Sequence, residues 1–255
     1  MAQINHLGNP YISFFPIEDN GLPEQTWHIS EDVRGFIYVG ANNGLMEYNG
    51  TNWNVYETDN KSVIRFVLPH PSGRIYIGGM HTFGFFEPDS LGLLKYYSLL
   101  DLLDENEKDF NDVWQILTFG SDIYFLTIRK IFCYNPENNS LTIIKSPSGF
   151  QQSGIINNTL LVGIDDIGLC RIEGNETILL KGGDFFKDKA IFSILPYDSI
   201  HIFVSTHHDV YIFNLRDGYF EKKMTNTIRS EFTIASKRIY HVLLNKKKQF
   251  LISTI

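Results

Sequence analysis

Short apolar runs separated by polar turns follow one another along the whole chain, and their spacing repeats. The clearest group lies in residues 36–56, where apolar runs at 36–40, 45–48 and 53–56 are divided by turns that contain Asn and Gly. Asn-Gly is the dipeptide that accepts positive φ at both central positions of a tight hairpin turn. This pattern predicts an antiparallel meander of short strands.

The meander recurs along the chain, and each copy starts with one additional strand, as at 27–32 in the first copy. We count five complete copies with four strands each and a sixth that stops after two strands. A repeat of roughly 40 residues built from four strands is typical of a β-propeller, in which every blade is a four-stranded meander. The predicted blades span 25–58, 63–99, 112–146, 149–182, 190–225 and, for the partial copy, 237–255.

A β-sandwich is the main alternative fold, because it also consists of short strands at regular spacing. The second strand of each copy separates the two folds. At 36–39, 75–77 and 202–204 this strand is apolar on both faces, whereas a sandwich strand usually alternates buried with solvated residues. We therefore predict an all-β protein, an incomplete β-propeller with about five four-stranded antiparallel blades and a partial sixth.

Two segments fall outside the repeat. Residues 1–24 precede the first blade, and we expect the run at 11–15 to be a strand that closes the ring with the last blade of a complete propeller. Ala and Gln after Met1 resemble the remainder of a secretory cleavage site, so we expect a signal peptide upstream. Residues 99–112, with four leucines followed by four acidic residues, predict a short amphipathic helix between the second and third blades.

Composition narrows the class of function. The chain of 255 residues is 43% hydrophobic, has a net charge of −7 and has a pI near 5.6. This argues against a nucleic-acid partner, since such a partner requires a basic patch, and the three lysines at 246–248 are interpreted as a solvated turn. No apolar run reaches the roughly 18 residues of a membrane span.

The two cysteines, Cys133 and Cys170, lie in apolar runs and lack the spacing of a zinc site. When the corresponding strands of the two copies are aligned, the two cysteines differ by one position. We therefore expect them on opposite faces of those strands. We interpret both as small buried hydrophobic residues, and we expect neither a metal nor another cofactor.

Candidate ligand-binding residues lie in the loops between the second and third strands of the blades. In a propeller these loops gather at one end of the central channel, where ligands usually bind. The loops are polar and varied between apolar strands, although turns are polar in any protein. The candidates are Asn42, Asn43, His81, Arg129, Lys130, Asp165, Asp166, His207, His208 and Asp209.

Two of these loops could also carry chemistry. The His207-His208-Asp209 sequence combines imidazole with carboxylate, which suits a metal ion or proton transfer, but adjacent side chains point apart. Asp165 and Asp166 could form the carboxylate pair of a glycosidase, yet neighbouring carboxylates seldom reach the opposed geometry that this reaction needs. The chain has no nucleophile elbow, phosphate loop or HExxH motif, so we expect no catalytic residues.

Large aromatic residues recur at one place in the first strands: Trp27 and Trp114 occupy it in the first and third copies, and Phe192 occupies it in the fifth. The tryptophans could serve as stacking platforms for sugar rings. The recurrence favours packing between blades, and we interpret both tryptophans as core residues.

The first two copies share a motif that resembles the two-component regulator propeller repeat. The later copies keep the order of strands and lose most of the glycines. In the first copy the motif consists of Trp27, Asp32, Gly35, Gly40, Asn43, Gly44, Leu45, Tyr48, Gly50 and Trp53.

The resemblance implies the periplasmic sensor region of a membrane-anchored regulator of the Bacteroidetes type. In such regulators the propeller repeats precede a triple-tyrosine module, a transmembrane helix and an output domain such as a histidine kinase, so the resemblance implies a truncated sensor region. It also implies a carbohydrate-derived or other small ligand and signalling through rearrangement of a homodimer. The alternatives are a carbohydrate-active propeller enzyme, either a hydrolase or a lyase, and a protein-interaction scaffold.

Overall fold

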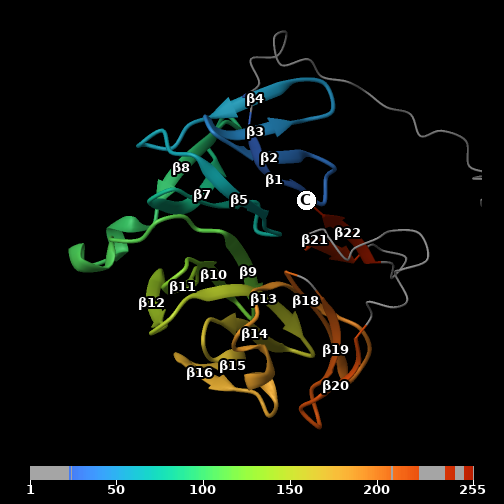
Figure 1. The fold of residues 1–255 in the computed structure, drawn as a ribbon. Helices are drawn as coiled ribbons and strands as arrows, with labels where there is room; N and C mark the ends of the chain where they lie inside the picture. Colours follow the sequence, from blue (N-terminus) through green and yellow to red (C-terminus); the bar gives the residue numbers. More distant parts are fainter. Residues whose placement is uncertain (1–22, 24, 208, 224–238, 245–249, 255) are drawn as a thin grey trace, which may run out of the picture.

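The computed structural model describes residues 23, 25–207, 209–223, 239–244 and 250–254. Within these residues the chain forms five four-stranded sheets and one two-stranded sheet, all antiparallel, which follow one another around a common centre without closing into a ring (Figure 1). Helical structure in this part of the chain is limited to three short 3₁₀ turns. The predicted all-β class is confirmed.

Each predicted copy contains one sheet, and we name these sheets blades 1 to 6. Within every sheet neighbouring strands are also neighbours in the chain. Blade 1 consists of β1 (Thr26–Glu31), β2 (Ile37–Ala41), β3 (Gly44–Tyr48) and β4 (Trp53–Tyr56). Blade 2 consists of β5 (Ile64–Pro69), β6 (Ile75–Gly79), β7 (Thr82–Pro88) and β8 (Leu94–Ser98). Blade 3 consists of β9 (Gln115–Phe119), β10 (Asp122–Leu126), β11 (Lys130–Asn135) and β12 (Ser140–Lys145).

The remaining blades follow the same plan. Blade 4 consists of β13 (Phe150–Ile156), β14 (Thr159–Ile164), β15 (Gly168–Glu173) and β16 (Glu176–Leu179), and the 3₁₀ turn η3 (Gly183–Phe186) follows it. Blade 5 consists of β17 (Ile191–Pro196), β18 (His201–Thr206), β19 (Val210–Asn214) and β20 (Phe220–Lys223), and blade 6 of β21 (Ile239–Leu244) and β22 (Phe250–Thr254). The first strands β1, β5, β9, β13, β17 and β21 contact one another in turn and line the centre.

Packing between the blades uses both faces of the second strands β6, β10, β14 and β18. In β6, Ile75 and Ile77 lie in a buried cluster shared with blade 1, whereas Tyr76 between them lies in a cluster shared with blade 3. In β10, Phe125 faces blade 2 and Tyr124 faces blade 4. Side chains of a strand alternate between its faces, so each of these strands belongs to two clusters at once. The burial of both faces that the sequence predicts is therefore present.

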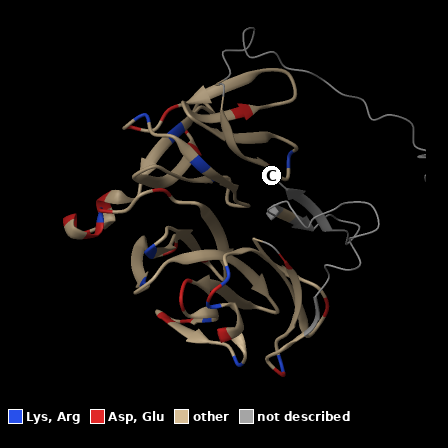
Figure 2. Ribbon diagram, viewed as in Figure 1, with Lys and Arg blue, Asp and Glu red and all other residues tan. Residues whose placement is uncertain are grey.

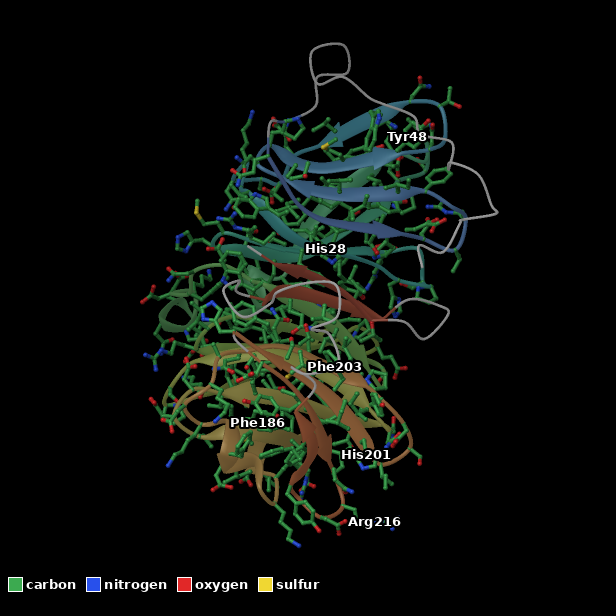
Figure 3. All side chains as sticks on the ribbon, turned by 45° about the vertical axis from the view of Figure 1, so that its right-hand side comes forward. His28, Tyr48, Phe186, His201, Phe203 and Arg216 are labelled. Carbon is green, nitrogen blue, oxygen red and sulfur yellow. The ribbon has the colours of Figure 1, made fainter. Side chains whose placement is uncertain are left out.

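The same arrangement continues to the end of the described array. Phe186 lies in the cluster between blades 4 and 5, and Phe203 lies in the cluster between blades 5 and 6 (Figure 3). Charged residues lie mainly in turns and at outer edges, and most of the inner ribbon is formed by other residues (Figure 2). The blades therefore meet through apolar surfaces, and polar groups remain at the ends of the strands.

Gly44 illustrates why the hairpin turns of blade 1 need glycine. Its φ angle is +127°, and a Cβ atom at this position would lie 2.2 Å from the carbonyl oxygen of Tyr56. An L side chain has neither the backbone conformation nor the space that this turn requires.

The segment between blades 2 and 3 differs from the single amphipathic helix predicted for it. It forms two 3₁₀ turns, η1 (Leu100–Leu102) and η2 (Glu105–Glu107), because Leu103 and Asp104 between them are extended. Leu103 turns into the cluster between blades 2 and 3, which interrupts the helical path. The prediction of one helix is wrong because burial of Leu103 in this cluster outweighs local helical periodicity.

Electrostatic contacts attach this segment to blade 3. The Glu107 carboxylate lies 2.6 Å from the Lys145 ammonium group and 3.0 Å from that of Lys130. A hydrogen bond from Lys145, which has the larger effect, and one from Lys130 lower the pKa of Glu107 below its usual value. The carboxylate therefore stays ionised in the folded protein and holds the segment against two strands of blade 3.

Cys133 and Cys170 lie in one buried cluster between blades 3 and 4, one cysteine from each blade. Blade 3 contacts blade 4 with one face of its sheet, and blade 4 contacts blade 3 with the opposite face of its own sheet. The two thiols therefore lie on opposite faces of corresponding strands and are both buried, as predicted.

Two of the sequence-based expectations lie outside the described residues: the closing strand at 11–15 and the solvated turn at 246–248. In the part of the chain that the structure describes, no helix has the length and apolar character needed to cross a membrane.

We expect Phe125→Ala to lower the free energy of unfolding by about 3–5 kcal/mol, because it removes a fully buried ring and leaves a cavity between blades 2 and 3. Denaturant titration followed by circular dichroism measures this change. Val33 is 93% exposed and serves as the control, since Val33→Ala should change stability by no more than about 0.5 kcal/mol. Equal unfolding midpoints for the two variants would contradict the packing described here.

We expect both cysteines to resist thiol reagents in the native protein. Burial raises the pKa of Cys133 to about 12 and that of Cys170 to about 11, so both thiols stay protonated at pH 8. Ellman's reagent should titrate both thiols only after denaturation. Rapid labelling of either cysteine under native conditions would refute the burial of this cluster.

Candidate functional site

The first strands share an irregularity near their beginning. In β5, Ile64 pairs with Gly79 and Phe66 pairs with Gly78, so Arg65 is an extra residue without its own partner. This is a β-bulge, which bends the strand and redirects the side chain of the extra residue. Equivalent register shifts occur in β1, β13, β17 and β21.

Blade 3 has the same feature just before its first strand begins. Gln115 pairs with Leu126, and the backbone N–H of Trp114 also donates a hydrogen bond to the carbonyl oxygen of Leu126. Trp114 and Gln115 thus both face Leu126, as in a β-bulge. We name the extra residues the bulge positions: Trp27, Arg65, Trp114, Gln151 with Gln152, Phe192 and, from the backbone register alone, Tyr240.

The bulge changes the interpretation of the tryptophans. Trp27 is 36% exposed and Trp114 is 42% exposed, so neither is a core residue between blades. The prediction of inter-blade packing is wrong for both, because the extra residue of a bulge leaves the alternation that places its neighbours in the core. The recurrence of this position along the sequence marks a surface around the centre of the array.

Three of the bulge positions line one pocket. Trp114, Gln152 and Phe192, from the first strands of blades 3, 4 and 5, surround a volume of about 430 Å³ together with Ile128 and Asp165 from the loops above them. We name this space the channel pocket. Its size lies within the range of roughly 300–1,000 Å³ that is usual for small-molecule sites, and it combines aromatic walls with a few polar groups.

The polar groups of the channel pocket differ in how far they are engaged. The Gln151 amide nitrogen donates to Asp165 Oδ1 at 2.6 Å, and its amide oxygen accepts from the Ile191 N–H at 2.8 Å. The Gln152 amide, in contrast, has no hydrogen bond to any described residue. Gln152 is therefore available to a ligand, whereas Gln151 holds blade 4 against blade 5.

Side chains next to the bulges tie the first strands together. Gln115 accepts from the Ser153 N–H at 2.9 Å and donates to the Ser153 carbonyl oxygen at 3.0 Å, which links blade 3 to blade 4. Between blades 1 and 2 the rings of His28, labelled in Figure 3, and Phe66 stack with their centroids 3.7 Å apart. These contacts fix the walls of the centre in position.

Three of the residues predicted from the loops contact a bulge position of their own blade. Asn42 Oδ1 accepts from the Trp27 indole N–H at 2.7 Å, and Asp165 accepts from Gln151. The His207 ring stacks on Phe192 with centroids 5.0 Å apart. The loops and the bulge positions therefore lie at the same end of the array.

The other predicted residues that the structure describes do not line the channel pocket. The Lys130 ammonium group donates to the carbonyl oxygens of Glu107 and Asp109, and Arg129 donates to that of Pro147. The remaining positions are less informative about a ligand: Asn43 is exposed, His81 bonds the Phe110 carbonyl oxygen, Asp166 has a left-handed backbone, Asp209 accepts from the Tyr211 hydroxyl group, and His208 lies outside the described residues.

The loop at His207 and the loop at Asp165 and Asp166 are the two candidate sites of chemistry. Among the described residues no group of three or more His, Cys, Asp or Glu side chains could hold a metal ion. Asp165 lines the channel pocket without a second carboxylate beside it there, because Asp166 is not among the lining residues.

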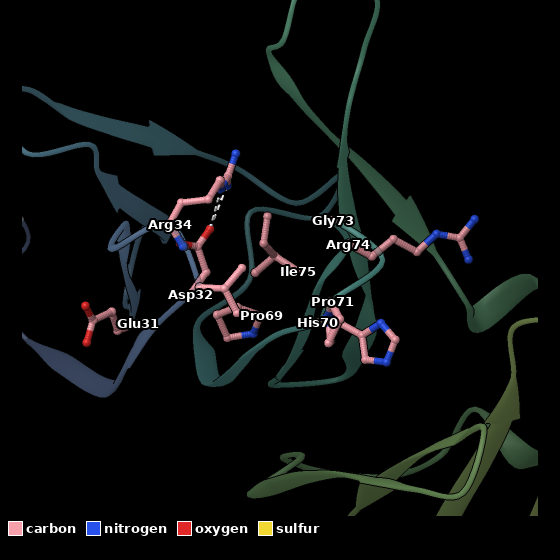
Figure 4. A pocket seen from close by; sticks show the side chains of 10 residues that line it. Glu31, Asp32, Arg34, Pro69, His70, Pro71, Gly73, Arg74 and Ile75 are labelled. Atoms are coloured by element: carbon pink, nitrogen blue, oxygen red, sulfur yellow. Dashed lines mark hydrogen bonds and ion pairs between the residues drawn. The ribbon is translucent and has the colours of Figure 1, made fainter.

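A second pocket, of about 250 Å³, lies at the other end of blades 1 and 2 (Figure 4). Glu31 and Asp32 are its acidic lining residues, and Asp32 accepts hydrogen bonds from the Arg34 side chain at 2.8 Å and from the N–H of Phe36 at 3.1 Å. Burial acts to raise the pKa of Asp32, but these hydrogen bonds outweigh it and the pKa lies below its usual value. Asp32 and Arg34 therefore serve the β1–β2 turn, and the channel pocket is the better candidate.

We expect Trp114→Ala to change the free energy of unfolding by no more than about 1 kcal/mol, because the exposed indole contributes mainly a cation–π contact. The variant should also lose a large share of the fluorescence that acrylamide quenches in the native protein. Urea titration and quenching measure the two effects. A loss of stability as large as that expected for Phe125→Ala would restore the core interpretation.

No protein-family model matches the chain, and no curated protein matches it. Solved structures do match. The extracellular domain of the putative hybrid two component system BT3049 from B. thetaiotaomicron has a TM-score of 0.67 at 18% identity, over 96% of this chain and 34% of that one. The extracellular domain of the putative one component system BT4673 from the same organism has a TM-score of 0.66 at 17% identity, over 90% of this chain and 30% of that one.

The structure of an enzyme is also similar to that of this chain. Virginiamycin B lyase from Staphylococcus aureus has a TM-score of 0.63 at 10% identity, over 90% of this chain and 84% of the lyase. The chain spans about a third of the length of the two extracellular domains and most of the length of the lyase. At these identities the likeness concerns the fold, and the chain has the β-propeller fold that occurs in extracellular domains of hybrid two-component systems.

Proposed function

We propose that the chain is the ligand-sensing part of an extracytoplasmic receptor of the two-component or a related type, located in the periplasm and anchored to the membrane through another part of the protein. The observation that carries this proposal is the set of bulge positions, which place the exposed Trp114, the half-buried Phe192 and an unengaged amide around the channel pocket. The likeness to extracellular domains of such systems supports it.

The ligand is a small carbohydrate-derived molecule. Trp114 and Phe192 offer ring faces on which the apolar face of a sugar can stack, and aromatic side chains are frequent in the walls of ligand pockets. The Gln152 amide can donate to and accept from hydroxyl groups, and the Asp165 carboxylate can accept from them. Aromatic walls together with an amide and a carboxylate suit a ring that carries hydroxyl groups.

Signalling follows from differential affinity. A ligand that binds one arrangement of a homodimer more tightly than another shifts the population toward the first arrangement. The channel pocket is formed by three consecutive blades, so an occupied pocket constrains how these blades sit against one another.

The lyase among the similar structures makes a carbohydrate-active or other propeller enzyme the second candidate. Asp165 is the carboxylate that such an enzyme would use in the channel pocket. Product formation from a bound glycan, and its loss in Asp165→Asn, would favour this candidate over the sensor. Retention of a protein partner without binding of any small molecule would favour a scaffold.

The sensor proposal is tested by measuring binding of a panel of neutral and acidic oligosaccharides by calorimetry. We expect Trp114→Ala to weaken the best ligand by about 2 kcal/mol, roughly thirtyfold, because a central aromatic contact is lost. Tyr219 is 61% exposed outside the channel pocket, and Tyr219→Ala is the matched control with unchanged affinity. Absence of binding across the panel, or equal affinity of the Trp114 variant and the parent protein, would refute the proposal.

A further inference from the structure

Arg65 lies between two exposed tryptophans at consecutive bulge positions. Its guanidinium carbon is 3.7 Å from the ring centroid of Trp27 in blade 1 and 5.0 Å from that of Trp114 in blade 3. A cation over an aromatic face is attracted by the electron density of the ring, most strongly for Trp. The three side chains form a continuous stack across three blades, which we name the Trp-Arg-Trp stack.

Only part of the hydrogen-bonding capacity of Arg65 is used. Its Nε donates to Asp112 Oδ1 at 2.8 Å, whereas the terminal Nη1 and Nη2 atoms donate to no described residue. Nη1 is also out of contact with solvent. A buried donor without an acceptor costs free energy, so an acceptor that reaches this end of the guanidinium group gains more than one that binds an already solvated donor.

Arg34 provides the contrast within the same chain. It also stacks on an aromatic ring, that of Phe36 at 4.5 Å, and pairs with a carboxylate, that of Asp32. Its Nη2 atom, however, additionally donates to the Tyr38 hydroxyl group at 2.9 Å. Stacking and pairing with a carboxylate therefore do not by themselves leave an arginine with free terminal nitrogens. Among the arginines that the structure describes, Arg65 alone has a terminal nitrogen that is buried without a hydrogen bond.

We propose that Arg65 recognises an acidic group of the ligand, so that the receptor selects an oligosaccharide that carries a carboxylate or a sulfate. This inference rests on the proposed sensor function. Nη2, the terminal nitrogen that solvent reaches, can donate a charge-assisted hydrogen bond to an oxygen of such a group, and the planar guanidinium group adds a second, parallel bond from Nη1 when ligand binding opens access to it. The flanking indoles hold the plane of the guanidinium group in place and restrict its rotation.

The position of the Trp-Arg-Trp stack relative to the channel pocket sets the minimum size of the ligand. Trp114 belongs to both features, since it lines the pocket and lies against Arg65. A sugar ring bound in the channel pocket is therefore separated from the Arg65 guanidinium group by the width of the Trp114 indole. The ligand must extend past Trp114, which requires at least two sugar units.

A second cation lies close to this path. Arg129 is exposed and directly follows Ile128, which lines the channel pocket. The carboxylates of Asp112 and Asp165 balance the two arginines, so the site as a whole is not strongly basic. Selectivity for an acidic ligand then depends on directed hydrogen bonds at Arg65 more than on long-range attraction.

The test uses matched pairs of probes: oligogalacturonates and oligoglucuronates with their methyl esters, and sulfated disaccharides with their desulfated forms. Calorimetry measures each pair against the parent protein, Arg65→Gln and Arg65→Lys. We expect at least one acidic probe to bind about tenfold or more tightly than its neutral counterpart, because charge-assisted bidentate hydrogen bonds are lost in the neutral form. The carboxylate and sulfate pairs distinguish the two kinds of acidic group.

Arg65→Gln should abolish this preference, and Arg65→Lys should reduce it, because lysine keeps the charge but lacks the planar fork. Arg34→Gln at the opposite end of blade 1 is the matched control and should keep the preference (Figure 4). Thermal unfolding checks each variant, and Arg65→Lys carries the test if Arg65→Gln fails to fold.

Two outcomes would overturn the proposal, and they differ in what else they refute. Equal affinity for acidic and neutral probes, or a preference that survives both Arg65 variants, would refute the role of Arg65 and leave the sensor function intact. Absence of binding to every probe would refute both.

Discussion

The burial of both faces of the second strands in blades 1 to 5 is the constraint on which the rest of the structure depends. Residues such as Ile75 and Tyr76 alternate between two clusters, so a blade is stable only with a neighbour on each side. The blades therefore form a curved array with the first strands at its centre. The first strands have to follow the positions that this packing dictates, and their own hydrogen bonding adapts to it.

The first strands adapt to this packing through the β-bulge. Within a few residues of the bulge, some side chains serve packing and others are available for function. Ile64 and Phe66 keep their pairing with β6, while Arg65 between them leaves the ladder. In four blades the bulge places a side chain outside the buried clusters between blades, at Trp27, Arg65, Trp114 and Phe192. The β-propeller fold is shared with a lyase as well as with extracellular sensor domains, so function depends on which residues occupy these positions.

The channel pocket and the Trp-Arg-Trp stack are two parts of one surface that meet at Trp114. Gln115 and Gln151 hold the neighbouring first strands at fixed separations through hydrogen bonds across the blades. A ligand in this surface would therefore contact side chains whose positions depend on the packing of five consecutive blades. This connects recognition at the centre with the relative placement of the sheets.

The sequence by itself determined the strands, the turns and the burial of both faces of strands such as β6, because alternation and turn chemistry are local properties. It also contained the recurrence of Trp27 and Trp114. Only the tertiary structure decided that these residues are exposed, because the partner strand sets the register of a bulge. The same holds for Leu103, whose burial between two blades replaces the predicted helix by two turns, and for Arg65, whose stack joins side chains from three separate sheets.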